Sequence, residues 1–115
     1  MDAEKIVEEL ALKARKAART LSTATGAERK AALEAIAQAI ESRSAEILAA
    51  NELDMVSARA EDLHPQMQDR LLLTADRIKG IAGGARQVAA LPDPLGQTLR
   101  QSTLPNGLEL QQISV

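Results

Sequence analysis

QTLRQSTLPNGLELQQISV, residues 97–115, predicts two strands joined by a turn at residues 104–108. The sequence before it has helical patterns throughout, so this ribbon has no sheet of its own to join. A two-stranded hairpin is only marginally stable in water, and its open edges favour pairing with another strand. We expect the second strand to be still running at Val115. We therefore expect further sequence or a partner to complete the ribbon.

The turn of the ribbon can be specified from Leu104-Pro105-Asn106-Gly107-Leu108. A two-residue turn centred on Asn106-Gly107 would put Pro105 where the ladder needs an N–H, which proline lacks. We therefore expect Pro105 and Asn106 at the centre of a type I turn, followed by Gly107 in a left-handed G1 bulge.

The apolar residues of the second strand change face along its length. Leu108 and Leu110 share one face, whereas Ile113 and Val115 share the other. This change of phase predicts a bend or bulge near Gln111-Gln112.

The first ninety residues carry the 3.6-residue apolar period of amphipathic helices. Thr25 with Glu28 forms a capping box, Pro65 suits a first helical turn, and Thr74 is a good N-cap. Pro92 and Pro94 end the last helix. The five predicted helices are residues 2–21, one beginning after Thr25, residues 43–59, residues 65–72, and one beginning after Thr74.

Four of the five predicted helices have a face expected to pack. These faces are Ile6, Leu10, Ala14, Ala17 and Leu21, with Val7 and Ala18 alongside, in the first helix; Ala32, Leu33, Ile36, Ala37 and Ile40 in the second; Ile47, Asn51, Asp54 and Ala58 in the third; and Ile78, Ile81, Ala82, Ala85 and Val88 in the fifth. Because buried polar groups need partners, Asn51 and Asp54 should bind neighbouring backbone N–H groups.

Three glycines lie inside the fifth predicted helix. Gly80, Gly83 and Gly84 each cost up to about 1 kcal/mol relative to alanine. We expect another element to pack closely on them and offset this cost.

The chain has 115 residues and a mass of 12.3 kDa, enough for one domain. Hydrophobic residues make up 45%, yet Phe, Trp and Tyr are absent. Alanine and aliphatic side chains must fill the core, and alanine buries little area. We therefore expect limited stability for the isolated chain.

Net charge and cysteine content narrow the classes of function. The net charge of −2 and pI of about 5.4 argue against nucleic acid as a partner. No apolar run is long enough to span a bilayer, and no signal-peptide pattern opens the sequence. The absence of cysteine removes disulfides, a thiolate nucleophile and Cys-based metal sites. A cytoplasmic protein without membrane partners is the simplest interpretation.

No arrangement of side chains in the sequence predicts catalysis. His64 precedes a proline at a helix start, which favours a capping or exposed histidine over a metal site with Glu61 or Asp62. Neighbouring carboxylates such as Glu8-Glu9 point about 100° apart on a helix and do not converge. The basic residues from Lys13 to Arg19 lack interleaved aromatic side chains, and the pair at residues 83–84 lacks phosphate-loop spacing. We assign no catalytic, cofactor-binding or metal-ligating residue.

Several segments, in their order and spacing, resemble one family. They are ILAAN (47–51) with Asp54, DRLLLT (69–74), Arg77-Ile78, RQVAALPDPLG (86–96), and the ribbon from Arg100 through LPNGL (104–108). Over nearly its whole length the chain resembles the N-terminal region of gamma-glutamyl phosphate reductase, or glutamate-5-semialdehyde dehydrogenase, of the aldehyde dehydrogenase superfamily. Asn51, Asp54, Asp69 and Arg70 match recurring family positions, and we assign them structural roles.

The resemblance implies an enzyme of proline biosynthesis that reduces L-glutamyl 5-phosphate with NADPH to glutamate 5-semialdehyde and phosphate. Its cysteine thiolate attacks the acyl phosphate, and hydride reduces the thioester. The resemblance further implies that residues 1–96 are a helical region packing on a nucleotide-binding domain. Residues 97–115 would then form part of an oligomerisation ribbon that meets the rest of the chain or a like subunit.

This sequence departs from the family in lacking the nucleophilic cysteine and the cofactor-binding strands. The segment alone is therefore expected to be inactive and to bind no NADPH. The fold class predicted is mainly α, with about five helices followed by a protruding two-stranded ribbon, as in the N-terminal part of an α/β aldehyde-dehydrogenase-like fold. The alternative function is a free-standing helical interaction module that uses its ribbon for strand addition to a partner.

Overall fold

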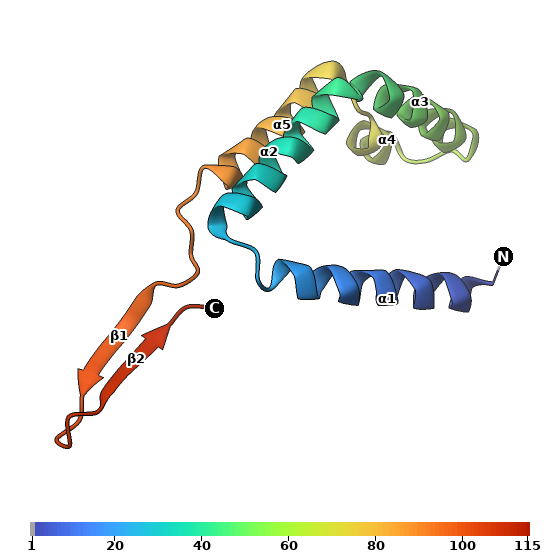
Figure 1. Cartoon of the computed structure of the whole chain (residues 1–115). Helices are drawn as coiled ribbons and strands as arrows, with labels where there is room; N and C mark the ends of the chain where they lie inside the picture. The colour runs from blue at the N-terminus through green and yellow to red at the C-terminus, as the bar shows by residue number, and fades with distance from the viewer. Residues whose placement is uncertain (1) are drawn as a thin grey trace.

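The computed structural model describes residues 2–115. These residues form five helices followed by one antiparallel two-stranded sheet (Figure 1). The elements are α1 (Ala3–Leu21), α2 (Gly26–Ser42), α3 (Ser44–Ala60), α4 (Pro65–Leu71), α5 (Ala75–Ala89), β1 (Thr98–Thr103) and β2 (Glu109–Ile113). The predicted fold class is confirmed.

The molecule is extended. Its radius of gyration is 21.6 Å and its principal extents are 73 × 37 × 27 Å, whereas a compact domain of about this length has a radius near 13 Å. Helices α2 and α5 lie side by side, with α3 and α4 at one end of the pair and the ribbon at the other (Figure 1). Helix α1 projects away from them and, within residues 2–115, contacts no other element.

The predicted helix starts are confirmed in atomic detail. Thr25 accepts a hydrogen bond of 3.1 Å from the Glu28 N–H, and the Glu28 carboxylate accepts one of 3.2 Å from the Thr25 N–H. The Thr74 hydroxyl accepts from the Arg77 N–H at 3.2 Å. His64 caps α4, since its Nδ1 accepts from the backbone N–H two residues later at 3.3 Å.

The core is a thin seam centred on the α2–α5 contact. Ile78 is its largest fully buried side chain, and most of the others are alanines. Alanine allows two helices to approach closely but contributes little hydrophobic stabilisation. The buried apolar residues are Ala37, Met55, Ala58, Ile78, Ala82 and Ala89.

The apolar faces predicted for α2 and α5 are too wide. Ile36, Ile81 and Val88 are 51%, 49% and 53% exposed, respectively. The buried positions of α5 instead follow a narrow stripe through Ile78, Ala82 and Ala89. A single neighbouring helix covers only such a stripe, so the flanking aliphatic side chains stay exposed. In α1 no residue is buried.

Asn51 and Asp54 were both predicted to bind neighbouring backbone groups, and only Asn51 does so. Asn51 is buried and binds backbone groups, whereas Asp54 is exposed, so the prediction for Asp54 is wrong. The buried stripe of α3 continues from Asn51 to Met55 and Ala58, four and seven residues on. That spacing leaves Asp54 beside the stripe rather than on it.

The close packing predicted over Gly80, Gly83 and Gly84 is not present within residues 2–115. A methyl group added at any of the three would meet no atom within 4 Å. These glycines therefore form an open strip along α5 rather than a tight helix contact.

No helix within residues 2–115 combines the length and the hydropathy that a membrane crossing requires.

Candidate functional site: the ribbon and its anchor

The ribbon turn has the predicted geometry. The Gly107 N–H donates to the Leu104 carbonyl at 2.9 Å, and the Leu104 N–H donates to the Leu108 carbonyl at 2.8 Å. Gly107 has a φ of 86°, the left-handed conformation of a G1 bulge, whereas Asn106 does not have a positive φ. The Asn106 side chain accepts from the Leu108 N–H at 3.1 Å, which further fixes the turn.

The predicted irregularity is present, but the extra residue lies in the opposite strand. Thr98 pairs with Ile113 and Arg100 pairs with Gln112, so Leu99 is the additional residue. The bulge therefore faces the predicted position at residues 111–112. The change of apolar phase in β2 predicted the correct position along the ribbon, but it did not determine which of the two strands would carry the bulge.

The ribbon is exposed on both faces. Every residue of β1 and β2 is exposed, and the two strands pair only with each other within residues 2–115. Its outer edges therefore carry backbone groups free to pair with a further strand. This is the surface best suited to binding another polypeptide.

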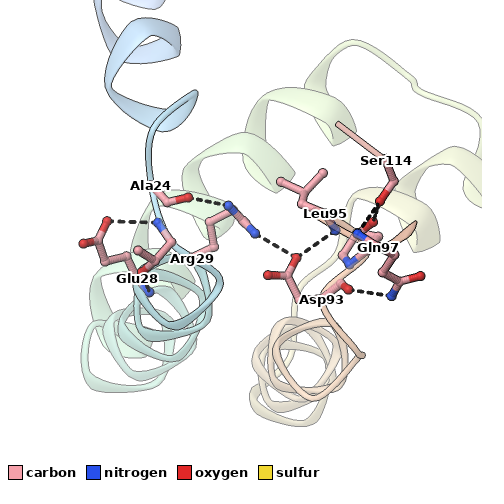
Figure 2. Close-up of polar contacts among 9 residues, drawn as sticks. Ala24, Glu28, Arg29, Asp93, Leu95, Gln97 and Ser114 are labelled. Carbon is pink, nitrogen blue, oxygen red and sulfur yellow. Dashed lines mark hydrogen bonds and ion pairs between the residues drawn. The ribbon is translucent and has the colours of Figure 1, made fainter. Parts of the chain in front are cut away.

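The anchor of the ribbon is the corner at residues 91–97, and Asp93 is its centre (Figure 2). One carboxylate oxygen of Asp93, Oδ1, accepts from the Leu95 N–H at 3.0 Å and from the Arg29 guanidinium at 2.8 Å. The hydrogen bond from the Leu95 N–H has the largest effect and, together with Arg29, it lowers the pKa of Asp93 below the ordinary aspartate value, against the opposing effect of burial. Arg29 also donates to the Ala24 carbonyl at 2.6 Å, so one side chain joins the α1–α2 linker to the corner.

Ser114 closes the base of the ribbon against the same corner (Figure 2). Its hydroxyl donates to the Pro94 carbonyl and accepts from the Gln97 N–H at 3.0 Å. Its backbone N–H donates to the Gln97 carbonyl at 3.0 Å, and its carbonyl accepts from the Gly96 N–H at 2.9 Å. The end of the second strand and the start of the first are therefore held together by backbone and side chain.

An open groove lies beside this anchor. Its volume is about 800 Å³, and it runs between the first two turns of α2 and the end of α5 with its following corner. Leu33, Val88 and Leu91 line it together with Pro92, while Arg29 and Lys30 supply positive charge. Asp93 is the one carboxylate among the residues that line the groove, and it is already paired with Arg29.

The candidate catalytic and metal-binding groups are not brought together. His64 is occupied in capping α4, and within residues 2–115 no three His, Asp or Glu side chains gather in a metal-binding arrangement. Glu8 and Glu9 lie on the isolated helix α1. The exposed edges of the ribbon are the feature of this arrangement that another strand could pair with, and no residue is assigned a catalytic role.

Sequence analysis missed the pairing of Arg29 with Asp93. The two residues lie 64 positions apart, and no local pattern links them. Gly26 carried a weak signal of this contact. Glycine has a much lower helix propensity than alanine, so its presence at the first position of a helix indicates that a larger side chain would not fit there. An added methyl group there would lie 2.2 Å from Oδ2 of Asp93.

Individual known proteins resemble this chain, although no family model does. The chain matches no protein-family model. It is 48% identical over 99 residues to gamma-glutamyl phosphate reductase from Geobacillus thermodenitrificans, covering 86% of this chain and 24% of that protein. The protein of the same name from Kineococcus radiotolerans is 46% identical over 103 residues, 90% of this chain and 24% of the relative. That from Leptospira interrogans is 43% identical over 104 residues, 90% of this chain and 25% of the relative.

A solved structure agrees with these sequences. The crystal structure of gamma-glutamyl phosphate reductase from Thermotoga maritima matches with a TM-score of 0.88 and 32% identity, over 91% of this chain and 25% of that one. The chain thus spans about a quarter of the length of the curated relatives it matches, at their N-terminal end. The resemblance predicted from the sequence is confirmed for this N-terminal segment.

Proposed function

We propose that this chain acts as the N-terminal segment of a gamma-glutamyl phosphate reductase. The observation that carries the proposal is its identity of 43–48% to three such reductases over 86–90% of its length. In the proposed reaction the complete enzyme uses NADPH to reduce L-glutamyl 5-phosphate to glutamate 5-semialdehyde, releasing phosphate, in cytoplasmic proline biosynthesis. A cysteine outside these 115 residues would be the nucleophile, because the chain has none.

The chain's own part in this activity is structural. Residues 1–96 would pack on the nucleotide-binding domain, and residues 97–115 would belong to the element that joins subunits. Two features support this assignment. The apolar face of α1 is exposed along its whole length, and the aliphatic side chains of Ile81 and Val88 on α5 are about half exposed. Apolar faces of this kind are normally covered by another part of a protein.

A chimeric enzyme tests the proposal. Residues 1–115 would replace the matching N-terminal quarter of the Geobacillus thermodenitrificans reductase, and NADP⁺ reduction by glutamate 5-semialdehyde and phosphate would be measured. We expect an active chimera. The reductase without its N-terminal quarter, and the 115-residue chain alone, serve as controls and should both be inactive. A folded but inactive chimera, or activity of the chain alone, would contradict the proposal.

The alternative, a free-standing interaction module, is supported by the ribbon's open edges. Strand addition would give it a partner without any catalytic body. The two functions differ in whether the ribbon can bind its partner without the catalytic body. A module should bind its partner as the isolated 115-residue chain, whereas a reductase segment should assemble only when the catalytic body is present. Size-exclusion chromatography with light scattering, on the chain and on the chimera, separates them.

A further inference from the structure

The direction of the ribbon is set by very few contacts. Within residues 2–115, neither strand packs on any helix. The corner that joins α5 to β1, residues 91–97, is exposed throughout and contributes no buried apolar side chain. The ribbon is therefore not held to the helices by a hydrophobic contact, and polar interactions at the corner must orient it.

Asp93 connects the helices to the corner of the ribbon, which the hydrophobic core does not do. Its Oδ1 accepts from Arg29 on α2 at 2.8 Å and from the Leu95 N–H at 3.0 Å, so it binds a helix and the corner at once. From Leu95 the chain runs directly into Gly96 and Gln97, which bind Ser114 at the base of the ribbon. These hydrogen bonds, together with the short stretch of chain from Leu95 to Gln97, connect α2 to the base of the ribbon (Figure 2).

Gly26 is the third member of this arrangement. A Cβ at this position would lie 2.2 Å from Oδ2 of Asp93 and 3.0 Å from its Cγ, but 3.5 Å from its Cβ. Only glycine therefore leaves space for the carboxylate. The carboxylate also lies at the N-terminus of α2, where the helix dipole favours a negative charge. Any larger residue would push the carboxylate aside and break its bonds to Arg29 and Leu95.

We infer that Gly26, Arg29 and Asp93 form a latch that fixes the direction in which the ribbon leaves the α2–α5 pair. These are positioning residues for an interaction surface. The inference rests on the proposed function in one respect, that the ribbon joins subunits. A ribbon fixed in direction presents its edges to a partner in one geometry, so the latch determines which assembly can form.

The absence of cysteine makes a direct measurement possible. Ala35→Cys on α2 and Thr103→Cys on β1, both at exposed positions, would carry two spin labels on the 115-residue chain. Electron–electron double resonance then measures the distance between α2 and the ribbon. We expect one narrow distance distribution in this background. Asp93→Ala and Gly26→Ala should each replace it with a broad one.

Two further variants separate the latch from a general loss of structure. Gly83→Ala is the matched control, since a methyl group at Gly83 meets nothing within 4 Å, and it should keep the narrow distribution. Gly26→Ala introduced into the Asp93→Ala background should add no further broadening, because the nearest remaining atom would be the Cβ at 3.5 Å. The Leu95 amide should exchange with solvent roughly tenfold faster in Asp93→Ala, because it loses its acceptor.

A distribution that stays narrow in both Asp93→Ala and Gly26→Ala would overturn the latch, as would a distribution already broad in the parent. If either variant fails to fold by circular dichroism, Arg29→Ala should also broaden the distribution, since it removes the ion pair and the bond to the Ala24 carbonyl but leaves Asp93 and the Leu95 bond in place. In the chimera, loss of the latch should lower the fraction of assembled enzyme. The distances are measured on the 115-residue chain, so an inactive chimera would not contradict the latch. A distance distribution that contradicts the latch would likewise not contradict the assignment to the reductase.

Discussion

Arg86 on α5 binds Glu41 on α2 through two parallel hydrogen bonds of 2.6 and 2.8 Å. Nε of the same guanidinium lies 3.6 Å from a carboxylate oxygen of Glu34, which is also on α2. These charges flank the alanine-rich seam between the two helices, where hydrophobic stabilisation is small. The planar guanidinium matches a carboxylate in a way that lysine cannot, so this pair joins α2 to α5 beside their buried contact.

The Arg86–Glu41 pair predicts a particular dependence of stability on pH. The hydrogen bond from Arg86 holds the pKa of Glu41 below the ordinary value of 4.5. A carboxyl group whose pKa is lower in the folded state stabilises the protein above its unfolded pKa, and this contribution is lost as the pH falls through the folded pKa. The melting temperature of Glu41→Gln should therefore lie below that of the parent at neutral pH. The difference should shrink below about pH 4.5.

Glu8→Gln serves as the control for that comparison, since Glu8 lies on α1, which contacts no other element within residues 2–115. It should change the melting temperature little at any pH. A difference between parent and Glu41→Gln that persists unchanged into strong acid would contradict the role of the ion pair.

Replacing Asn51 should destabilise the chain far more than replacing Asp54. The Asn51 amide donates to the Leu71 carbonyl and accepts from the Leu73 N–H, both at 2.9 Å, and so holds the link between α4 and α5. Asn51→Ala leaves both backbone groups without these partners and should lower the free energy of unfolding by about 2 kcal/mol. Asp54→Ala, at an exposed position, should change it by less than about 0.5 kcal/mol. Urea denaturation measures both, and equal effects would refute the assignment.

Two isoleucines on α5 provide a matched pair for the core. Ile78 is 2% exposed and Ile81 is 49% exposed. Ile78→Ala should cost about 3 kcal/mol, whereas Ile81→Ala should cost less than about 1 kcal/mol in the 115-residue chain. In the chimera we expect Ile81→Ala to become costly, since the catalytic body would cover that face. If the cost of Ile81→Ala stays small in a folded chimera, another surface must meet the body.

The isolation of α1 predicts its dynamics. Most of the stability of a helix in a protein comes from tertiary packing, and the 19 residues of α1 contact no other element within residues 2–115. In the 115-residue chain the backbone amides of α1 should exchange with solvent roughly tenfold or more faster than those of α2. In the chimera they should become protected. Hydrogen exchange followed by mass spectrometry measures both, and equal protection of α1 and α2 in the free chain would contradict the observed exposure.

The features predicted correctly from the sequence are those that depend on residues close together in the chain. The capping box at Thr25, the cap at Thr74 and the turn with Gly107 each involve groups no more than four residues apart. Steric and hydrogen-bonding rules at that range leave few alternatives.

The features predicted wrongly or missed depend on what lies across space. The width of the buried face on α5 depends on how many elements cover it, and only α2 covers most of it, so Ile81 and Val88 are exposed. Asp93 and Arg29 are 64 residues apart, and neither residue type nor spacing indicates their contact. A bend or bulge was predicted near Gln111-Gln112, but the bulge lies in the opposite strand at Leu99, because pairing between the strands determines which strand carries it.

The central claim is that these residues act as one part of a larger reductase. The intact mass of the natural gene product, purified from its source and measured by mass spectrometry, tests that claim most directly. Because the chain matches about a quarter of each reductase, we predict a mass roughly fourfold above 12.3 kDa. A natural product of about 12.3 kDa would contradict the claim and favour the interaction module.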